Sequence, residues 1–223
     1  MAFLPNSLNS SGNSSQLRRR QPLICVTHCC KMACLDVPHR CSGCGEKLYK
    51  LKSPAFYLPI PYVNGHKTTF SILVKPTNGS WHDCHEKDAD FHVGISPRDA
   101  GGVSSYTSDG VIQELNGWEE SLIVFNISNP ECEMMWGKCL DQMSSEEKWS
   151  KYKYDENRYN CFDFALSLLT QVDESVKSFF GESPKLIPFS FNREEMRMRF
   201  VRRHVMPQVK IAANYHKLSV QVS

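Results

Sequence analysis

The sequence lacks any long apolar segment. No run in its 223 residues approaches the roughly 18 apolar residues of a membrane-spanning helix, so we expect no span. The N-terminus has no apolar core of the kind a signal peptide needs, because Pro5, Asn9 and Gly12 interrupt it. The formal net charge is only +2, which argues against nucleic acid as a partner for the chain as a whole. These absences predict a protein of the cytoplasm or nucleus.

Acidic residues are also absent before Asp36, whereas Arg18, Arg19 and Arg20 lie upstream of it. A basic, Ser-rich and acid-poor segment also describes a transit peptide. No amphipathic helix is visible there, however, and residues 1–22 show no apolar period. We therefore expect these residues to form a disordered tail.

Cysteine is abundant, and six of the ten cysteines fall within residues 23–50. In a reducing compartment they are better interpreted as thiols or metal ligands than as disulfides. The segment Cys41-Ser42-Gly43-Cys44-Gly45 is a CxxC knuckle, which is a common half of a zinc site. We predict one structural zinc in a small cysteine-rich module, held by Cys29, Cys34, Cys41 and Cys44.

The second half of that site remains open in the sequence. Spacing does not separate Cys29 from Cys30, and His28, Cys25 and His39 are further candidate ligands. A reduced hairpin without metal is the alternative.

Residues 51–180 read as an α+β core domain. About five strand candidates follow one another at meander spacing, and helical periodicity begins at Pro130. The predicted strands are Phe70–Val74, Phe91–Ile95, Val103–Thr107, Val111–Leu115 and Ser121–Ile127. Ser144 fits a capping box for a short second helix, and Asn160 fits the N-cap of an apolar one. Strands followed by helices favour an antiparallel sheet packed on helices.

Residues 181–223 are expected to form C-terminal helices docked on the core. Asn192 with Glu195 predicts a helix start, and Pro207 predicts its end. The arginines of this stretch fit a solvated helix face better than an anion-binding surface, because no aromatic stacking platform accompanies them. The polar cluster His82-Asp83-Cys84-His85 similarly fits a solvated loop better than a metal site.

His92 and Cys161 are the candidate catalytic residues. His92 lies on a predicted strand, and Cys161 follows the N-cap Asn160, where the helix dipole lowers a thiol pKa. A nearby imidazole would complete a nucleophile–base dyad, with the Asn160 amide near a developing oxyanion. The alternative is a packed core cysteine, a hydrogen-bonded core histidine and an ordinary N-cap.

Several motifs resemble the makorin-two opposite-strand protein family. They are His-Val-Gly-Ile from His92, Gly-Trp-Glu-Glu-Ser from Gly117, Asn160-Cys161, and Lys-Pro-Thr-Asn-Gly from Lys75. The resemblance covers about residues 23–215, and the specific part is 70–170. It implies no established biochemical activity.

The order of a strand histidine followed by a helix-opening Asn-Cys is also similar to circularly permuted papain-like proteins. Among these are lecithin retinol acyltransferase relatives and PPPDE-type peptidases. This resemblance implies a permuted papain-like fold, with His92 as base and Cys161 as nucleophile. The third, orienting residue does not carry over, because Ser104, Ser105 and Tyr106 stand where the acyltransferases have a second histidine.

Two functions follow from these observations. The first is an intracellular, non-catalytic interaction protein with a papain-like core and an unidentified protein partner. The second is a thiol hydrolase or acyltransferase, of the peptidase or deubiquitinase type, that uses the Cys161–His92 dyad. The missing orienting residue favours the first.

Overall fold

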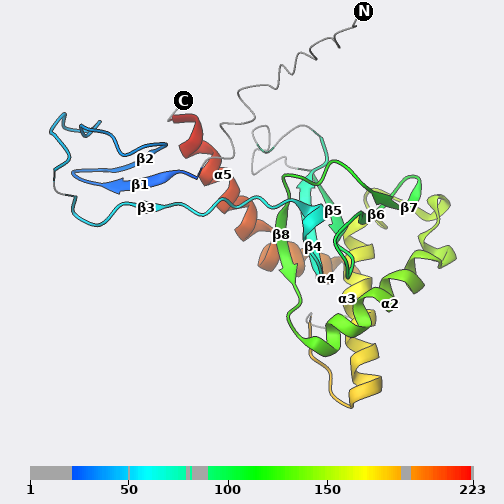
Figure 1. Ribbon diagram of the computed structural model, residues 1–223. Helices are drawn as coiled ribbons and strands as arrows, with labels where there is room; N and C mark the ends of the chain where they lie inside the picture. The colour runs from blue at the N-terminus through cyan, green and yellow to red at the C-terminus, as the bar shows by residue number, and fades with distance from the viewer. Residues whose placement is uncertain (1–21, 50, 79–80, 82–89, 187–191, 222–223) are drawn as a thin grey trace, which may run out of the picture. The chain divides into compact units, whose positions relative to one another are not determined.

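The computed structural model describes residues 22–49, 51–78, 81, 90–186 and 192–221 (Figure 1). The chain divides into two compact units, which we call unit 1 (residues 1–60 and 217–223) and unit 2 (residues 61–216). The predicted tail, apart from residue 22, and the cluster His82–His85 lie outside the described residues. No helix in the described part of the chain has the length and apolar character needed to cross a membrane.

Unit 2 is built on a five-stranded sheet in which every neighbouring pair is antiparallel. The strand order is β7-β6-β5-β4-β8. The strands are β4 (Ser71–Pro76), β5 (Phe91–Ile95), β6 (Val103–Thr107), β7 (Gly110–Glu114) and β8 (Leu122–Asn126). The α+β class and the antiparallel sheet predicted from the sequence are therefore confirmed.

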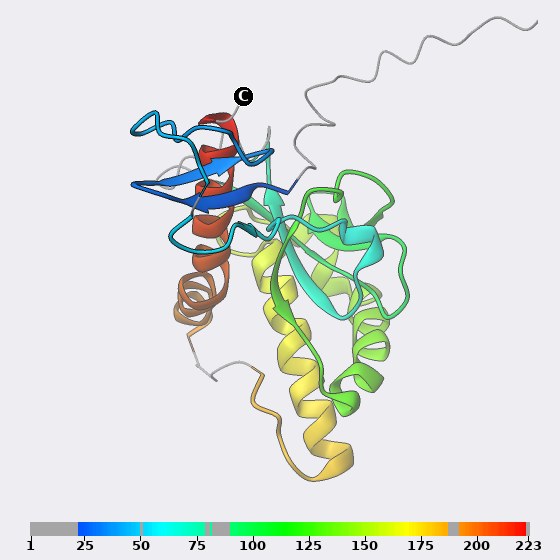
Figure 2. The same ribbon diagram turned by 60° about the vertical axis from the view of Figure 1, so that its left-hand side comes forward.

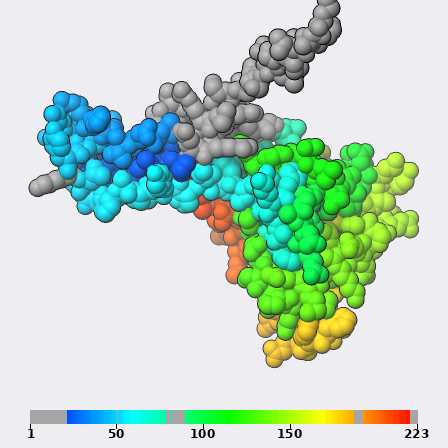
Figure 3. Space-filling model, in the orientation of Figure 1, coloured from blue at the N-terminus to red at the C-terminus, as the bar shows by residue number. Residues whose placement is uncertain are grey.

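Two helices cover one face of this sheet: α2 (Pro130–Ser144) and α3 (Cys161–Phe180). They lie side by side in both ribbon views (Figures 1 and 2). The main core lies between this helical layer and the sheet, and it includes Ile72, Val74, Val93, Ile95 and the buried face of α3. In Figure 3 the yellow and orange end of α3 and the loop after it form a projecting tip of unit 2.

The opposite face of the sheet has a second, smaller core. Leu73, Val103 and Trp118 are fully buried there, and Val63 and Ile123 pack against them. Trp118 lies in the loop between β7 and β8, which we call the Trp118 loop. A backbone hydrogen bond from Gly65 N–H to the Trp118 carbonyl (2.7 Å) holds this loop over the sheet. Side chains of adjacent strand residues point to opposite faces, so each strand contributes to both cores.

The helix starts predicted at Asn160 and Asn192 are confirmed, because each side chain accepts a hydrogen bond from a backbone N–H of the first helical turn. The capping box predicted at Ser144 is wrong. The Ser144 hydroxyl donates to the Leu140 carbonyl at the end of α2 instead (2.7 Å). Two short 3-10 helices follow, Glu147–Trp149 and Lys151–Lys153, and neither has a side-chain cap.

The prediction that Pro207 ends a helix is also wrong. Helix α4 (Arg193–Phe200) continues through a π-helical segment, Val201–Val205, into α5 (Met206–Gln221). Proline has no N–H to donate, and its ring crowds the preceding turn. The wider π turn, closed by a hydrogen bond from Met206 N to Val201 O, lies directly before the proline.

Unit 1 contains a three-stranded antiparallel sheet of order β2-β1-β3. Its strands are β1 (Ile24–Thr27), β2 (Lys31–Cys34) and β3 (Phe56–Tyr57). Val26, Met32 and Cys41 form its small core. A core of this size offers little hydrophobic stabilisation, so an additional constraint such as a bound metal is expected for this unit.

Candidate functional site

His92 lies on the face of the sheet opposite α3. It pairs in register with Lys75, whereas its neighbour Val93 pairs with Val74 in the main core. The His92 ring packs against the Trp118 ring (centroids 5.7 Å apart). Its Nε2 atom lies 3.8 Å from Glu114 Oε2. The alternation of side chains along β5 thus directs His92 towards the smaller core.

Glu114 is the centre of a polar cluster around His92. Its Oε2 atom accepts hydrogen bonds from Ser105 Oγ (2.8 Å) and Trp118 Nε1 (2.9 Å), and Lys75 Nζ donates to Oε1 (3.2 Å). Burial raises the pKa of Glu114, but the hydrogen bonds and the Lys75 charge outweigh it, so the net pKa is lowered. Glu114 is therefore ionised.

The His92 imidazole is held in its neutral form. Burial lowers the pKa of His92, and the Glu114 carboxylate only partly opposes that shift. The polar groups around His92 and Glu114 come from two places. They lie on the face of the sheet opposite α3 or in the Trp118 loop. No thiol belongs to this cluster among the described residues.

Cys161 lies on the other side of the sheet, in the first turn of α3. Its side chain is buried in the main core, and the residue is only 5% exposed. Burial raises the pKa of the Cys161 thiol to about 11, although the backbone N–H groups of Val93 and Phe162 act in the opposite direction. The carboxylate of Asp90 raises this pKa further. At neutral pH the group is a protonated core thiol, which is a poor nucleophile.

The structure therefore does not bring the predicted pair together. The Val93 backbone, and not the His92 ring, meets the Cys161 sulfur. The sequence motif identified a strand histidine and a helix-opening cysteine correctly, but the pleat of β5 places them on opposite faces.

Asn160 is fully used as a cap. Its Oδ1 atom accepts from Phe162 N (3.0 Å), and its Nδ2 atom donates to the Glu156 carbonyl (2.6 Å). Its own backbone N–H donates to Asp163 Oδ2 (3.0 Å), which completes a capping box. This geometry favours the N-cap interpretation of Asn160 over a role at an oxyanion.

Asp163 is a buried charge that the sequence reading overlooked. Its side chain is 1% exposed and faces two arginines of α4. Arg193 Nε lies 3.8 Å from Asp163 Oδ1, and Arg197 Nη1 lies 3.8 Å from Oδ2. Arg197 Nη1 also donates to the Asn157 carbonyl (3.1 Å). The signal available in the sequence was an acidic residue at the third position of one predicted helix together with arginines on a later one. This combination could have indicated an ion pair between the two helices.

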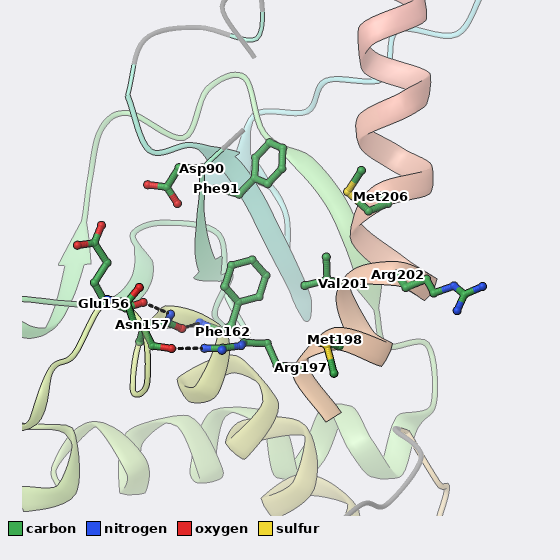
Figure 4. A pocket seen from close by; sticks show the side chains of 11 residues that line it. Asp90, Phe91, Glu156, Asn157, Phe162, Arg197, Met198, Val201, Arg202 and Met206 are labelled. Carbon is green, nitrogen blue, oxygen red and sulfur yellow. Dashed lines mark hydrogen bonds between the residues drawn. The ribbon is translucent and has the colours of Figure 1, made fainter. Parts of the chain in front are cut away.

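We call the ion pairs of Asp163 with Arg193 and Arg197 the Asp163 clamp. Beside it lies an open cleft with a volume of about 510 Å³ (Figure 4). Three segments of unit 2 form it: the start of β5, the turn that leads into α3, and the stretch from Arg197 to Met206. Figure 4 shows Phe91 and Phe162 near its centre, with Asp90 and Glu156 to one side. We call this feature the β5–α4 cleft. Its size is typical of ligand-binding clefts.

Unit 1 carries a separate cluster of potential metal ligands. His28, Cys29, Cys41 and Cys44 each offer one ligand atom, and these four atoms lie within 4.8 Å of one another. Cys29 Sγ is 3.4 Å from Cys41 Sγ, and Cys44 Sγ is 3.5 Å from His28 Nδ1. In a tetrahedral zinc site with Zn–S bonds of about 2.3 Å, ligand atoms are roughly 3.5–3.8 Å apart. The four residues thus fit a Cys₃His metal site.

The local backbone supports this fit. The knuckle turn closes through Gly45 N to Cys41 O (2.8 Å), and Gly45 adopts a φ of +74° that favours glycine. A Cβ atom at Gly43 would lie 2.8 Å from Cys30 Sγ, so the thiols approach this turn because it lacks a side chain. Backbone N–H groups, first that of Cys44, lower the pKa of Cys41 to about 5, which favours the thiolate that a metal requires.

The predicted ligand Cys34 is not part of this cluster, and His28 is in its place. Residues His28–Cys30 form the turn of the β1–β2 hairpin, whereas Cys34 pairs with Ile24 at the other end. Cys34 lies three residues along β2 from Lys31, where the turn ends, and three residues of a strand span about 10 Å. Cys34 is therefore too far from the turn to share a metal with its residues. Cys34 instead donates to the Ile24 carbonyl (3.3 Å).

Comparisons with known proteins agree with the division of the chain. Residues 21–48 match the family described as DUF4796 N-terminal, and residues 55–222 match DUF4796 C-terminal. The chain is also similar to the human MKRN2 opposite strand protein, with 32% identity over 155 residues. That alignment covers 67% of this chain and 69% of the relative.

No solved structure matches the chain, so the comparisons lend no support to a papain-like fold. The extent of the sequence matches, by contrast, establishes the family predicted from the motifs at His92, Gly117 and Asn160. The chain belongs to the DUF4796 family, and its similarity to the MKRN2 opposite strand protein places it among the makorin opposite-strand proteins.

Proposed function

We propose that this chain is a non-catalytic interaction protein whose N-terminal unit is held together by one structural zinc. The observation that carries the proposal is the placement of His92 and Cys161 on opposite faces of the sheet. A thiol nucleophile needs a base within hydrogen-bond reach, and this thiol has a backbone amide and apolar side chains around it.

The polarity around Cys161 supports the same conclusion. A catalytic thiol is activated by positive surroundings, whereas burial and the negative charge of Asp90 both raise the pKa of Cys161. The helix dipole of α3 does not overcome burial. Burial also outweighs the backbone N–H groups of Val93 and Phe162, which lower this pKa and would be needed by the alternative function as a thiol hydrolase or acyltransferase.

Labelling by a mild electrophile tests this proposal. Iodoacetamide at neutral pH should leave Cys161 unmodified in the native protein and should modify it fully in urea, as measured by peptide mass spectrometry. Cys132 is an internal control, because it is also fully buried and burial raises its pKa to about 11. Selective native labelling of Cys161 that is lost in a His92→Ala variant would establish the dyad and refute the proposal.

The zinc assignment has its own test. Metal analysis of the purified chain should find about one zinc per molecule, held by His28, Cys29, Cys41 and Cys44. A Cys41→Ser variant should lose the metal, and a Cys34→Ser variant should retain it because Cys34 lies outside the cluster. Cobalt substitution provides a second readout, since three thiolates and one imidazole give a spectrum distinct from four thiolates. Loss of zinc in Cys34→Ser as well as in Cys41→Ser would reinstate the ligand set predicted from the sequence, and retention of zinc in Cys41→Ser would refute both sets.

A further inference from the structure

The β5–α4 cleft has one apolar side. Its apolar members come from all three segments that form the cleft, and they are Phe91, Phe162, Met198, Val201 and Met206. Met198, one of these residues, is 59% exposed and extends the apolar side of the cleft to the surface. An apolar surface of this kind, hollowed and partly open to solvent, indicates that another apolar group covers it.

Two carboxylates, those of Asp90 and Glu156, lie together on one side of the cleft (Figure 4). Asp90 and Glu156 are exposed and make no ion pair among the described residues. Of the basic lining residues, Arg197 is already held by Asp163 and by the Asn157 carbonyl. The Arg202 side chain extends away from the other lining residues in Figure 4. A ligand in the cleft therefore meets uncompensated carboxylates beside the apolar surface.

Hydrogen bonds and an ion pair connect the walls of the cleft. The capping box of α3 fixes the turn that carries Glu156 and Asn157, and Asp163 ties that turn to α4 through Arg197. On the other side, the π-helical turn presents Val201 and Arg202 at the rim. Contacts that order the walls in advance reduce the entropic cost of binding, and π turns inside helices are frequent at functional sites.

We propose that the β5–α4 cleft binds a short segment of a partner protein in which an apolar side chain is flanked by Lys or Arg. The apolar side chain packs between Phe91, Phe162 and Val201, and the cationic group reaches Asp90 and Glu156. This assignment rests on the proposed interaction function and gives it a site and a class of partner. Charge complementarity determines the choice of a basic segment over an acidic or wholly apolar one.

Selection from a random-peptide phage library with the full chain tests this assignment. The enriched peptides should share an apolar residue next to Lys or Arg, and the affinity of a fluorescent representative is then measured by anisotropy. Replacing its basic residue by Gln should weaken binding, and so should Asp90→Asn combined with Glu156→Gln in the protein. We expect a loss of roughly tenfold, as is typical when close charge pairs at an interface are removed.

Matched variants separate the cleft from general effects of charge and hydrophobicity. Asp141→Asn with Glu182→Gln removes two exposed carboxylates outside the cleft and should leave binding unchanged. Met198→Gln should weaken binding, whereas Met134→Gln should not, because Met134 is 60% exposed on α2 outside the cleft.

The remaining outcomes are all contrary to the assignment. Enrichment of acidic or wholly apolar peptides, of a sequence that matches a segment of this chain, or of none, would overturn it. Peptides whose binding ignores every cleft substitution would also overturn it, yet they would leave the proposed interaction function intact. Native labelling of Cys161 would have the reverse effect, since it refutes the non-catalytic function without bearing on the cleft.

Discussion

His92 and Val93 are neighbours in the chain, yet they belong to different cores. Val93 faces α3, and His92 faces Trp118 and Glu114 on the other side of the sheet. The sequence predicted β5 with its bounds correct but did not determine which of its residues face the helices. Both faces of this sheet are partly apolar, so the hydrophobic pattern that usually reveals the orientation of a strand is weak here.

Gly94 explains how Trp118 reaches the sheet. A Cβ atom at this position would lie 2.5 Å from both Trp118 Cη2 and Val103 Cγ1, and both side chains are fully buried. We expect Gly94→Ala to lower the free energy of unfolding by about 2–3 kcal/mol, because neither neighbour has room to move.

Urea denaturation measures this difference, and Gly101→Ala is the control. A Cβ atom at Gly101 meets no atom within 4 Å, so that variant should be as stable as the parent or slightly more stable. Equal stability of the Gly94→Ala variant and the parent would show that Trp118 does not pack as described.

At the scale of elements, Asp163 links the start of α3 to α4. It closes the capping box with the backbone of Asn160 and faces Arg193 and Arg197. Arg193 also lies over the ring of Tyr159 (4.9 Å to the centroid). The N-cap could be predicted from Asn160 and the apolar pattern after it. The ion pairs of Asp163, by contrast, join residues thirty or more positions apart and have no local signature.

Removing this carboxylate should destabilise unit 2. Asp163→Ala loses a capping hydrogen bond and leaves two arginines without their partner, so we expect a cost of about 2–3 kcal/mol. Asp141→Ala, at an exposed position of α2, should cost less than about 0.5 kcal/mol. Thermal or urea unfolding compares the two. A similar small cost for both would mean that the Asp163 clamp contributes nothing to the fold.

The hairpin of unit 1 illustrates why a ligand set is harder to predict than a knuckle. Cys41 and Cys44 were identified from local spacing alone, because the CxxC turn brings both thiols to one point. The other half depends on which residues occupy the β1–β2 turn. Its pairing of Thr27 with Lys31 selects His28 and Cys29 and excludes Cys34.

At the scale of the whole molecule, the family matches and the structure both set residues 23–48 apart from the five-stranded sheet and its helices. The family matches separate residues 21–48 from 55–222, and the compact units divide near residue 60. The short strand β3, which was not among the predicted strands, pairs with β1 and so belongs to unit 1. A two-residue strand carries too little periodicity to be recognised.

The cleft also escaped sequence reasoning, because three separate segments of unit 2 assemble it. Individually, these segments resemble an ordinary strand start, a helix cap and a basic amphipathic helix. The third segment was not recognised as one continuous helix, because a proline such as Pro207 usually marks the end of a helical pattern. Only the continuation through the π turn brings Val201 and Met206 to the same cleft.

The central claim is that Cys161 is a structural thiol without a catalytic base. The most direct test is the pKa of this thiol, measured from the ¹³C chemical shift of its β carbon in cysteine-labelled protein across a pH titration. We predict a pKa of about 11, unchanged in a His92→Ala variant. A pKa below about 7 that rises when His92 is replaced would contradict the account, because it would show that the imidazole stabilises a thiolate.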